Sequence, residues 1–152
     1  MARVRPFAEG ARGRVEILRH RSRVLEGNPW DDPVERDFPV YLPPGYDPDG
    51  APHVALWDLA AFTNSGVGHL NWRNQGENLV QRLDRLIHQG DLPPVVVPMP
   101  DCFTSLGGNQ YINSPGVGAY GDYLVEELVP LLSTEFNVVE EAAGRGAFGK
   151  SS

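Results

Sequence analysis

The segment HVALWDL, residues 53–59, is a short apolar run of the kind that forms a strand buried on both faces of a sheet. The run VVV at residues 95–97 has the same character, and the prolines after it end the pairing near Val97 or Pro98. Between the two runs, residues 77–89 carry leucines at helical spacing. Strand, helix and strand in this order predict a right-handed crossover between two parallel strands.

The same pattern continues toward both ends of the chain. Residues 119–136 predict a second amphipathic helix, kinked at Pro130 because the proline ring clashes with the preceding turn. Residues 145–149 predict a third parallel strand, whereas residues 14–25 and 34–42 predict two strands of an antiparallel hairpin or meander. We therefore expect an α/β fold with a mostly parallel sheet and antiparallel N-terminal strands.

The length and charge of the chain limit its organisation and its partners. A length of 152 residues suffices for one domain, and we expect residues 1–13 to be a loose arm and residues 14–152 to be the domain. The net charge of -7 argues against a nucleic-acid binder. A basic N-terminal segment could touch RNA or anionic lipid, but its arginines are more typical of the solvated face of an edge strand. They are Arg3, Arg5, Arg12, Arg14, Arg19, Arg21 and Arg23.

The remaining composition predicts neither a metal site nor a membrane segment. Cys102 is the single cysteine, so an internal disulfide is excluded, and we interpret it as a packed thiol. The four histidines do not combine with it in a metal-ligand spacing, and no cofactor is expected. The N-terminus lacks the apolar run of a signal peptide, and no stretch approaches the length of a membrane span. A cytoplasmic protein with no membrane partner is the default expectation.

Two short motifs share the last residues of the chain. Residues 149–152, GKSS, match the front of a G-x-S-x-G nucleophile elbow, in which a serine occupies a strained turn between a strand and a helix. Residues 144–151, GRGAFGKS, also satisfy the phosphate-loop expression G-x-x-x-x-G-K-[ST], with Lys150 on the outer phosphates and Ser151 on magnesium. A phosphate loop follows a hydrophobic strand directly, and residues 137–143 offer only two valines before two glutamates. The local sequence favours the elbow.

Four segments resemble, in the same order, the esterase family of α/β-hydrolases, which contains enterochelin esterases, formylglutathione hydrolases, feruloyl esterases and mycolyltransferases. These segments are VYLPPGYDPDG at 40–50, LPPVVVPMPD at 92–101, GDYLVEELVPLLSTEF at 121–136 and GAFGKSS at 146–152. The resemblance implies a three-layer α/β-hydrolase sandwich, here incomplete. It also implies a serine hydrolase that acts on carboxylic esters.

The resemblance assigns roles to three residues. Ser151 aligns with the nucleophile, which needs a histidine base oriented by a carboxylate, and in this fold both partners follow the serine along the chain. The backbone N–H groups of Ser152 and Phe62 align with the oxyanion hole, which stabilises the negative charge of the transition state. Phe62 belongs to the turn after the first buried strand, where Ala60 and Ala61 replace the family's usual glycine.

Polar residues in the long loop at residues 101–117 form a second group of candidates. Loops of this length are usually functional, and ligands of open α/β sheets bind at the carboxyl ends of the strands. These side chains either shape the substrate pocket or cap turns of the loop. The candidates are Asp101, Asn109, Tyr111 and Asn113. His69 is the one histidine expected near the site, as a loop or pocket-wall residue in preference to a base.

Together these features predict a serine esterase that cleaves a small-molecule ester through an acyl-enzyme at Ser151. Because the base and the acid would follow Ser152, we expect little or no turnover from the 152-residue chain itself. A sheet that ended at this strand would leave one face uncovered, so we also expect a homo-oligomer or poor solubility. The alternatives are a P-loop nucleotide-binding protein that uses residues 144–151 and a non-catalytic module that kept the hydrolase scaffold.

Overall fold

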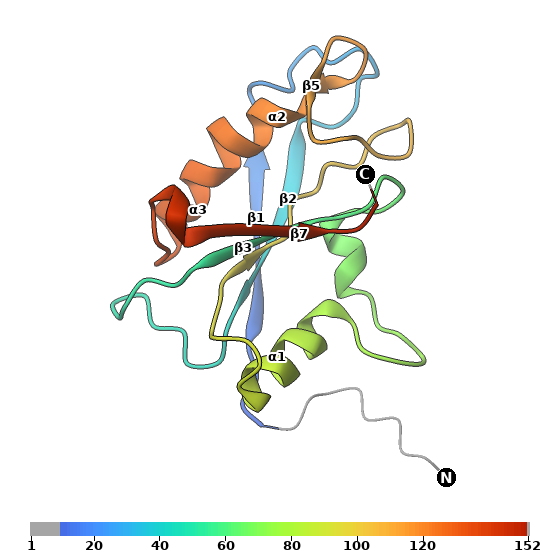
Figure 1. Cartoon of the computed structure of the whole chain (residues 1–152). Coiled ribbons are helices and arrows are strands. Elements are labelled where there is room, and N and C mark those ends of the chain that lie inside the picture. Colours follow the sequence, from blue (N-terminus) through green and yellow to red (C-terminus); the bar gives the residue numbers. More distant parts are fainter. Residues whose placement is uncertain (1–9, 152) are drawn as a thin grey trace.

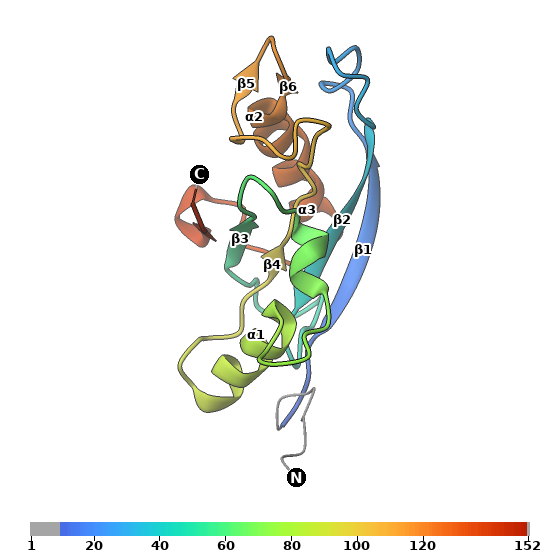
Figure 2. The same ribbon diagram turned by 90° about the vertical axis from the view of Figure 1, so that its right-hand side faces the viewer.

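A mixed sheet organises the computed structural model, which describes residues 10–151. Its strands lie in the spatial order β1-β2-β4-β3-β7, where hydrogen bonds around Val96 join β1-β2-β4 to β3-β7. Leu56 N–H donates to Val96 O at 2.8 Å, and Val96 N–H donates to Val54 O at 3.0 Å. The strands are β1 (Arg14–Arg21), β2 (Glu35–Leu42), β3 (Ala55–Leu59), β4 (Val97–Pro98) and β7 (Arg145–Gly149). Figure 2 shows β1 at one side of the molecule and β7 near the other.

The directions of the strands confirm the predicted antiparallel N-terminal strands and the parallel pairing of the later ones, but the described sheet is mixed and not mostly parallel. The strand β1 pairs antiparallel with β2 along its full length, and β2 pairs antiparallel with β4. The bridge between Ala55 and Val96 is parallel, and β3 pairs parallel with β7 from Ala55↔Arg145 to Leu59↔Gly149. The chain therefore enters the sheet through two antiparallel strands and ends it with three strands that run in the same direction (Figure 1).

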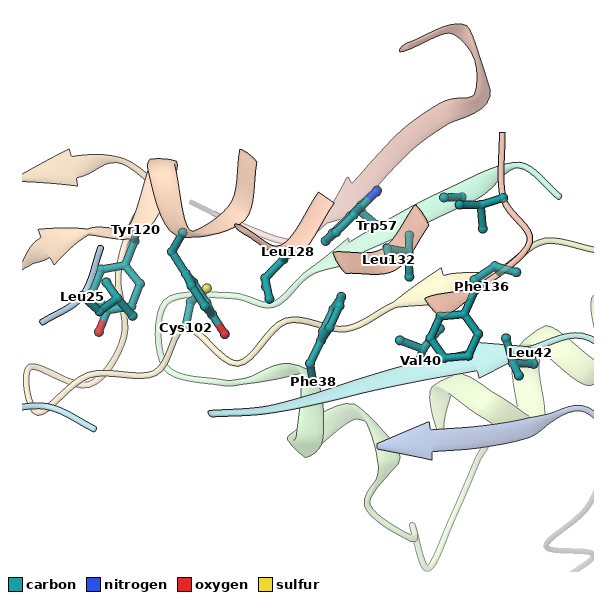
Figure 3. Packing of buried hydrophobic residues seen from close by; sticks show 14 residues of the cluster. Leu25, Phe38, Val40, Leu42, Trp57, Cys102, Tyr120, Leu128, Leu132 and Phe136 are labelled. Atoms are coloured by element: carbon teal, nitrogen blue, oxygen red, sulfur yellow. The ribbon is translucent and has the colours of Figure 1, made fainter. Parts of the chain in front are cut away.

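Alternate side chains of the central strands fill two separate cores. Val40, Val96 and Trp57 point into one core, and their neighbours Tyr41, Val97 and Leu56 point into the other. The first core is closed by the helical segments that follow the long loop, and Figure 3 shows Leu128, Leu132 and Phe136 over Phe38 and Val40. The second core is closed by Leu83 of α1. Helices thus cover both faces of the sheet, which is why the strands carry apolar residues on both sides.

The helix α1 (Leu79–Gln89) begins and ends where the local sequence places its caps. The Asn78 side chain accepts the backbone N–H of Gln81, and the Gln81 side chain accepts the backbone N–H of Asn78. Two otherwise unpaired donors are thus satisfied. Gly90 ends the helix with a φ of 80°, a conformation that glycine adopts without strain. The helix predicted for residues 77–89 is confirmed apart from its first two residues.

The second predicted helix is divided into three parts. It consists of α2 (Tyr120–Asp122), the π-helical turn η2 (Tyr123–Leu128) and α3 (Val129–Glu135). Pro130 lies in the first turn of α3 and has no N–H to donate, so an α-helical bond to Glu126 cannot form. The proline irregularity predicted from the sequence therefore takes the form of a widened turn directly before α3.

The first strand is shorter than predicted. β1 ends at Arg21, and residues 22–28 form turns instead of continuing to residue 25. Glu127 of η2 accepts the backbone N–H groups of Arg23 and Val24 at 2.9 and 3.1 Å, so these donors point away from a strand partner. Among the described residues β1 pairs only with β2, which confirms an edge strand with exposed arginines. Arg3 and Arg5 lie outside the described residues, as does most of the expected arm.

Smaller elements complete the chain. The loop after β3 contains a 3-10 turn, η1 (Gly66–Leu70), and the loop after β4 ends in a two-residue hairpin of β5 (Asn113–Ser114) and β6 (Gly118–Ala119) that the sequence did not predict. A second 3-10 turn, η3 (Ala142–Gly144), leads into β7. In residues 10–151 no helix has the length and apolar character needed to cross a membrane.

A buried arginine connects the start of β2 to the long loop. The Arg36 side chain is 3% exposed and forms an ion pair with Asp101 at 3.5 Å. Its guanidinium donates to Pro33 O at 2.8 Å, to Phe103 O at 2.6 Å and to the Tyr120 hydroxyl at 2.8 Å. One charged group therefore joins the sheet, the long loop and α2, and its partners offset the cost of burying it.

Replacing Arg36 by methionine is expected to lower the free energy of unfolding by about 3 kcal/mol, because the buried Tyr120 hydroxyl and two partly buried carbonyls lose a charged donor. Urea denaturation of the chain measures this loss. Arg19→Met is the matched control, since Arg19 forms only exposed ion pairs with Glu35 and Asp37 on the neighbouring strand. Similar losses in the two variants would contradict the special role of Arg36.

Candidate active site

Ser151 occupies a strained turn at the carboxyl end of β7. Its φ is 63°, in the left-handed region that residues other than glycine rarely adopt, and the residue is exposed. Gly149 lies two residues earlier, at the last paired position of β7, where an added Cβ would lie 2.6 Å from Leu59 O. A small residue is required there because β3 and β7 approach closely. An exposed serine on a strained turn after a parallel strand has the geometry expected of a nucleophile elbow.

The phosphate-loop interpretation fits the same residues poorly. Arg145–Gly149 form the strand β7 inside the motif and pair in register with β3. An extended strand does not curl its N–H groups around a phosphate, as a phosphate loop must. The segment before Gly144 is also a 3-10 turn and not a strand. The local geometry therefore favours the elbow over the nucleotide site.

An open pocket of about 420 Å³ lies beside Ser151. Leu59 of β3 and Phe148 of β7 line it, together with Tyr111 from the long loop and Lys150, the only lysine of the sequence. Tyr111 also has a positive φ of 58°, and its hydroxyl donates to Ala60 O at 2.6 Å. Burial is the main cause that raises the pKa of Tyr111 above its ordinary value. Of the predicted loop candidates, Tyr111 is the one that lines this pocket.

Phe62 lies in the loop after β3, which ends level with β7, but it is not among the residues that line the pocket beside Ser151. Gly108 of the long loop packs directly on the Phe62 backbone, and an added Cβ at Gly108 would overlap Phe62 O. Among the described residues the Phe62 N–H has no hydrogen-bond partner. An oxyanion donor needs an unpaired N–H of this kind, held by a rigid loop. Ser152, the other predicted donor, lies outside the described residues.

Asp101 and Asn113 lie away from the pocket beside Ser151. Asp101 accepts the Phe103 N–H at 3.0 Å and pairs with Arg36, lining a separate pocket of about 340 Å³. The Asn113 side chain accepts the Asp122 N–H at 2.9 Å and donates to its carboxylate at 2.7 Å. Asp101 thus caps a turn and Asn113 ties the long loop to α2, which are contacts of the architectural kind.

Cys102 and Asn109 also serve the architecture of the long loop. The Asn109 amide donates to Cys102 O, and its side-chain oxygen accepts the Tyr111 N–H at 2.5 Å, which helps to hold Tyr111 in its strained conformation. Cys102 is buried and unbridged, and burial raises the pKa of its thiol well above the ordinary value. Within residues 10–151 no three His, Cys, Asp or Glu side chains are grouped so that they could hold a metal ion.

His69 pairs with a carboxylate that the sequence analysis did not single out. Asp58 of β3 is 1% exposed, and its Oδ2 forms a hydrogen bond with His69 Nδ1 of η1. This hydrogen bond is the first cause that raises the pKa of His69 above its ordinary value. Neither residue lines the pocket beside Ser151. The sequence does contain a sign of this pair, because Asp58 is a charged residue inside the buried run HVALWDL and therefore requires a polar partner.

The comparisons with known proteins agree with this fold. No family model and no curated protein matches the sequence. Among solved structures, the chain is similar to a ferulic acid esterase from Anaeromyces mucronatus (TM-score 0.68, 16% identity), covering 94% of this chain and 50% of that chain. It is also similar to an S-formylglutathione hydrolase from Agrobacterium tumefaciens (TM-score 0.61, 20% identity), covering 93% and 50%.

A third similar structure is the feruloyl esterase module from Clostridium thermocellum, with a TM-score of 0.65 and 20% identity, covering 92% of this chain and 46% of that one. The chain therefore has part of the α/β-hydrolase fold of these esterases, as the sequence resemblance implied. It spans about half the length of the solved structures that it matches.

Substitution of Gly149 by alanine is expected to lower the free energy of unfolding by about 1–3 kcal/mol, because the new Cβ meets backbone that cannot move aside. Gly146→Ala is the matched control on the same strand, since its Cβ would lie 3.1 Å from the flexible end of Leu56. Urea denaturation of both variants measures the difference. A Gly146 variant that loses as much stability as the Gly149 variant would show that close approach of Leu59 is not the cause.

Proposed function

We propose that this chain is part of a serine hydrolase that cleaves small-molecule carboxylic esters through an acyl-enzyme at Ser151. The observation that carries the proposal is the left-handed conformation of Ser151, φ 63°, two residues after the end of a parallel strand. Strain of this kind is maintained only where the surroundings enforce it, and it lifts a serine hydroxyl above the sheet. The similar solved structures, which are named as ferulic acid esterases and a formylglutathione hydrolase, support this reaction class.

The oxyanion formed when Ser151 attacks the ester carbonyl would be stabilised by two backbone N–H groups. Ser152 would supply one, because it directly follows the nucleophile. Phe62 would supply the other from the loop after β3, where the packing of Gly108 holds its backbone in place. Preorganised donors of this kind are usually the largest single source of rate enhancement in acyl transfer. Leu59, Phe148 and Tyr111 would form the wall against which a small acyl or alcohol group packs.

The base that activates Ser151 would come from residues outside the 152-residue chain. Among the described residues no histidine lines the pocket beside Ser151, and this includes His69, although Asp58 holds its Nδ1 as a carboxylate holds the base of a triad. A serine hydroxyl without a base is a weak nucleophile. We therefore propose an incomplete three-layer hydrolase sandwich in which the longer protein supplies the catalytic histidine and acid.

In the longer protein, Ser151→Ala is expected to lower kcat for a small aryl ester by about 10⁶-fold, since the covalent route is lost. It should also abolish covalent labelling by a fluorophosphonate, measured by mass spectrometry. Ser133→Ala on α3 is the matched control, because the Ser133 hydroxyl donates to Val129 O at 3.4 Å within its own helix. Retained labelling in the Ser151 variant would refute the assignment of the nucleophile.

The 152-residue chain alone is expected to hydrolyse the same ester at a rate close to that of the buffer, with no change on Ser151→Ala. Turnover by the chain that disappears in the Ser151 variant would show that the base lies within these residues.

Magnesium-dependent ATP binding distinguishes the esterase proposal from the alternative of a P-loop nucleotide-binding protein. The esterase proposal expects none, whereas saturable binding that is lost on Lys150→Ala would support a phosphate loop.

A further inference from the structure

Asp58 and His69 make a side-chain contact across the two ends of one loop. Asp58 lies in β3, one residue before the strand ends, and His69 lies in η1. The Asp58 Oδ2–His69 Nδ1 hydrogen bond closes the intervening chain, residues 59–68, into a ring. Asp58 is 1% exposed, and its Oδ1 has no hydrogen-bond partner among the described residues. A carboxylate buried in this way is costly, and His69 is its one paired side chain in residues 10–151.

The loop at residues 59–68, whose ends this hydrogen bond joins, is also held in its middle by contacts with neighbouring backbone. Gly66 lies against the Met99 backbone, where an added Cβ would be 2.3 Å from Met99 O. Gly108 packs on Phe62 O, and the Tyr111 hydroxyl bonds Ala60 O at 2.6 Å. These contacts fix the middle of the loop, whereas Asp58 and His69 fix its ends. Phe62, the proposed oxyanion donor, lies inside the ring.

We propose that Asp58 and His69 are positioning residues whose hydrogen bond fixes the loop at residues 59–68, and with it the Phe62 N–H, for the oxyanion. This inference rests on the proposed function, because it assigns the loop to that reaction. Neither side chain lines the pocket beside Ser151, so the pair acts through the loop and not on the substrate. Oxyanion donors act only when they are already in place, which gives a distant contact of this kind a catalytic effect.

The charge state of the pair makes the contact measurable. Hydrogen bonding to Asp58 raises the pKa of His69 above its ordinary value of 6.5, against the opposing effect of burial. The charged pair therefore forms fully below pH 6.5 and loses its ionic part as the pH rises through the raised pKa. η1 packs against α1 and β2, whose buried Asp84 and Tyr41 hydrogen-bond each other at 2.8 Å. Tyr111 of the long loop, whose hydroxyl bonds Ala60 O, also faces this loop, and Asp58 adds to the effect of burial in raising the pKa of Tyr111.

The first experiment uses the 152-residue chain and is independent of activity. In NMR titrations, the backbone amides of residues 59–68 are expected to shift with the pKa of the His69 ring. In Asp58→Asn this pKa should fall toward 6.5, and the amide shifts should follow it. His69→Ala should speed hydrogen exchange of the hydrogen-bonded amides of this loop, those of Asn64 and Gly68, while leaving α1 unchanged. The proposal would be overturned if the amide chemical shifts of residues 59–68 did not follow the His69 titration. It would also be overturned if the exchange rates in this loop were unchanged in His69→Ala.

The second experiment measures kcat and KM of the longer protein. His69→Ala is expected to lower kcat by about tenfold with KM unchanged, less than the loss of about 100-fold or more on removal of an oxyanion donor. His69→Asn should restore most of kcat, because its amide can donate from a position close to that of Nδ1. His88→Ala, an exposed histidine of α1, is the matched control. A variant of His69 that loses stability but keeps kcat would overturn the positioning role.

Failure of the two proposals can be distinguished. If Ser151→Ala retains full activity, the proposed function is wrong, and the NMR result then reports only a structural contact. If Ser151→Ala is inactive and His69→Ala retains kcat, the esterase proposal stands and the positioning role is refuted.

Discussion

The parallel pairing of β3 with β7 is the constraint on which the rest of the site depends. Five residues of each strand pair in register, and the last pair joins Leu59 to Gly149. Because the two strands end at the same level, the loop that carries Phe62 and the turn that carries Ser151 leave the sheet side by side. Glycine at position 149 permits this approach, since Leu59 O occupies the space of a side chain. A shift of one residue would move Phe148 to the opposite face and separate the two turns.

Two buried charged groups stabilise the connections between the sheet and its loops. Arg36 joins β2 to the long loop and α2, and Asp58 joins β3 to η1. Each group requires a partner because an unpaired charge in the interior is costly. The apolar cores alone would tolerate several loop conformations, whereas these directional contacts select one. Packing thus supplies most of the stability, and buried polar contacts determine the conformation of the loops near Ser151.

The sequence predicted the elements whose cause is local and missed those whose cause is distant. The apolar runs located β3 and β4, and helical periodicity with Gly90 located α1, because burial and capping are encoded within a few residues. The predicted end of β1 was wrong. Glu127, about 100 residues further along the chain, accepts the backbone N–H groups of Arg23 and Val24, so these residues do not continue the strand. The Asp58–His69 pair was missed for a related reason. Its hydrogen bond depends on how the loop after β3 folds back, which no local pattern specifies.

The pairing of β3 with β7 also determines the order in which the molecule can form. β1 and β2 are close in sequence and pair early at little entropic cost, whereas β7 joins a strand about 90 residues upstream. During synthesis, one edge of β3 therefore stays unpaired until residues 145–149, which form β7, have left the ribosome. The strained serine turn cannot appear before that event. Within residues 10–151 the turn that carries Ser151 is therefore the last part to form, and a chain that stalls before residue 145 lacks both β7 and this turn.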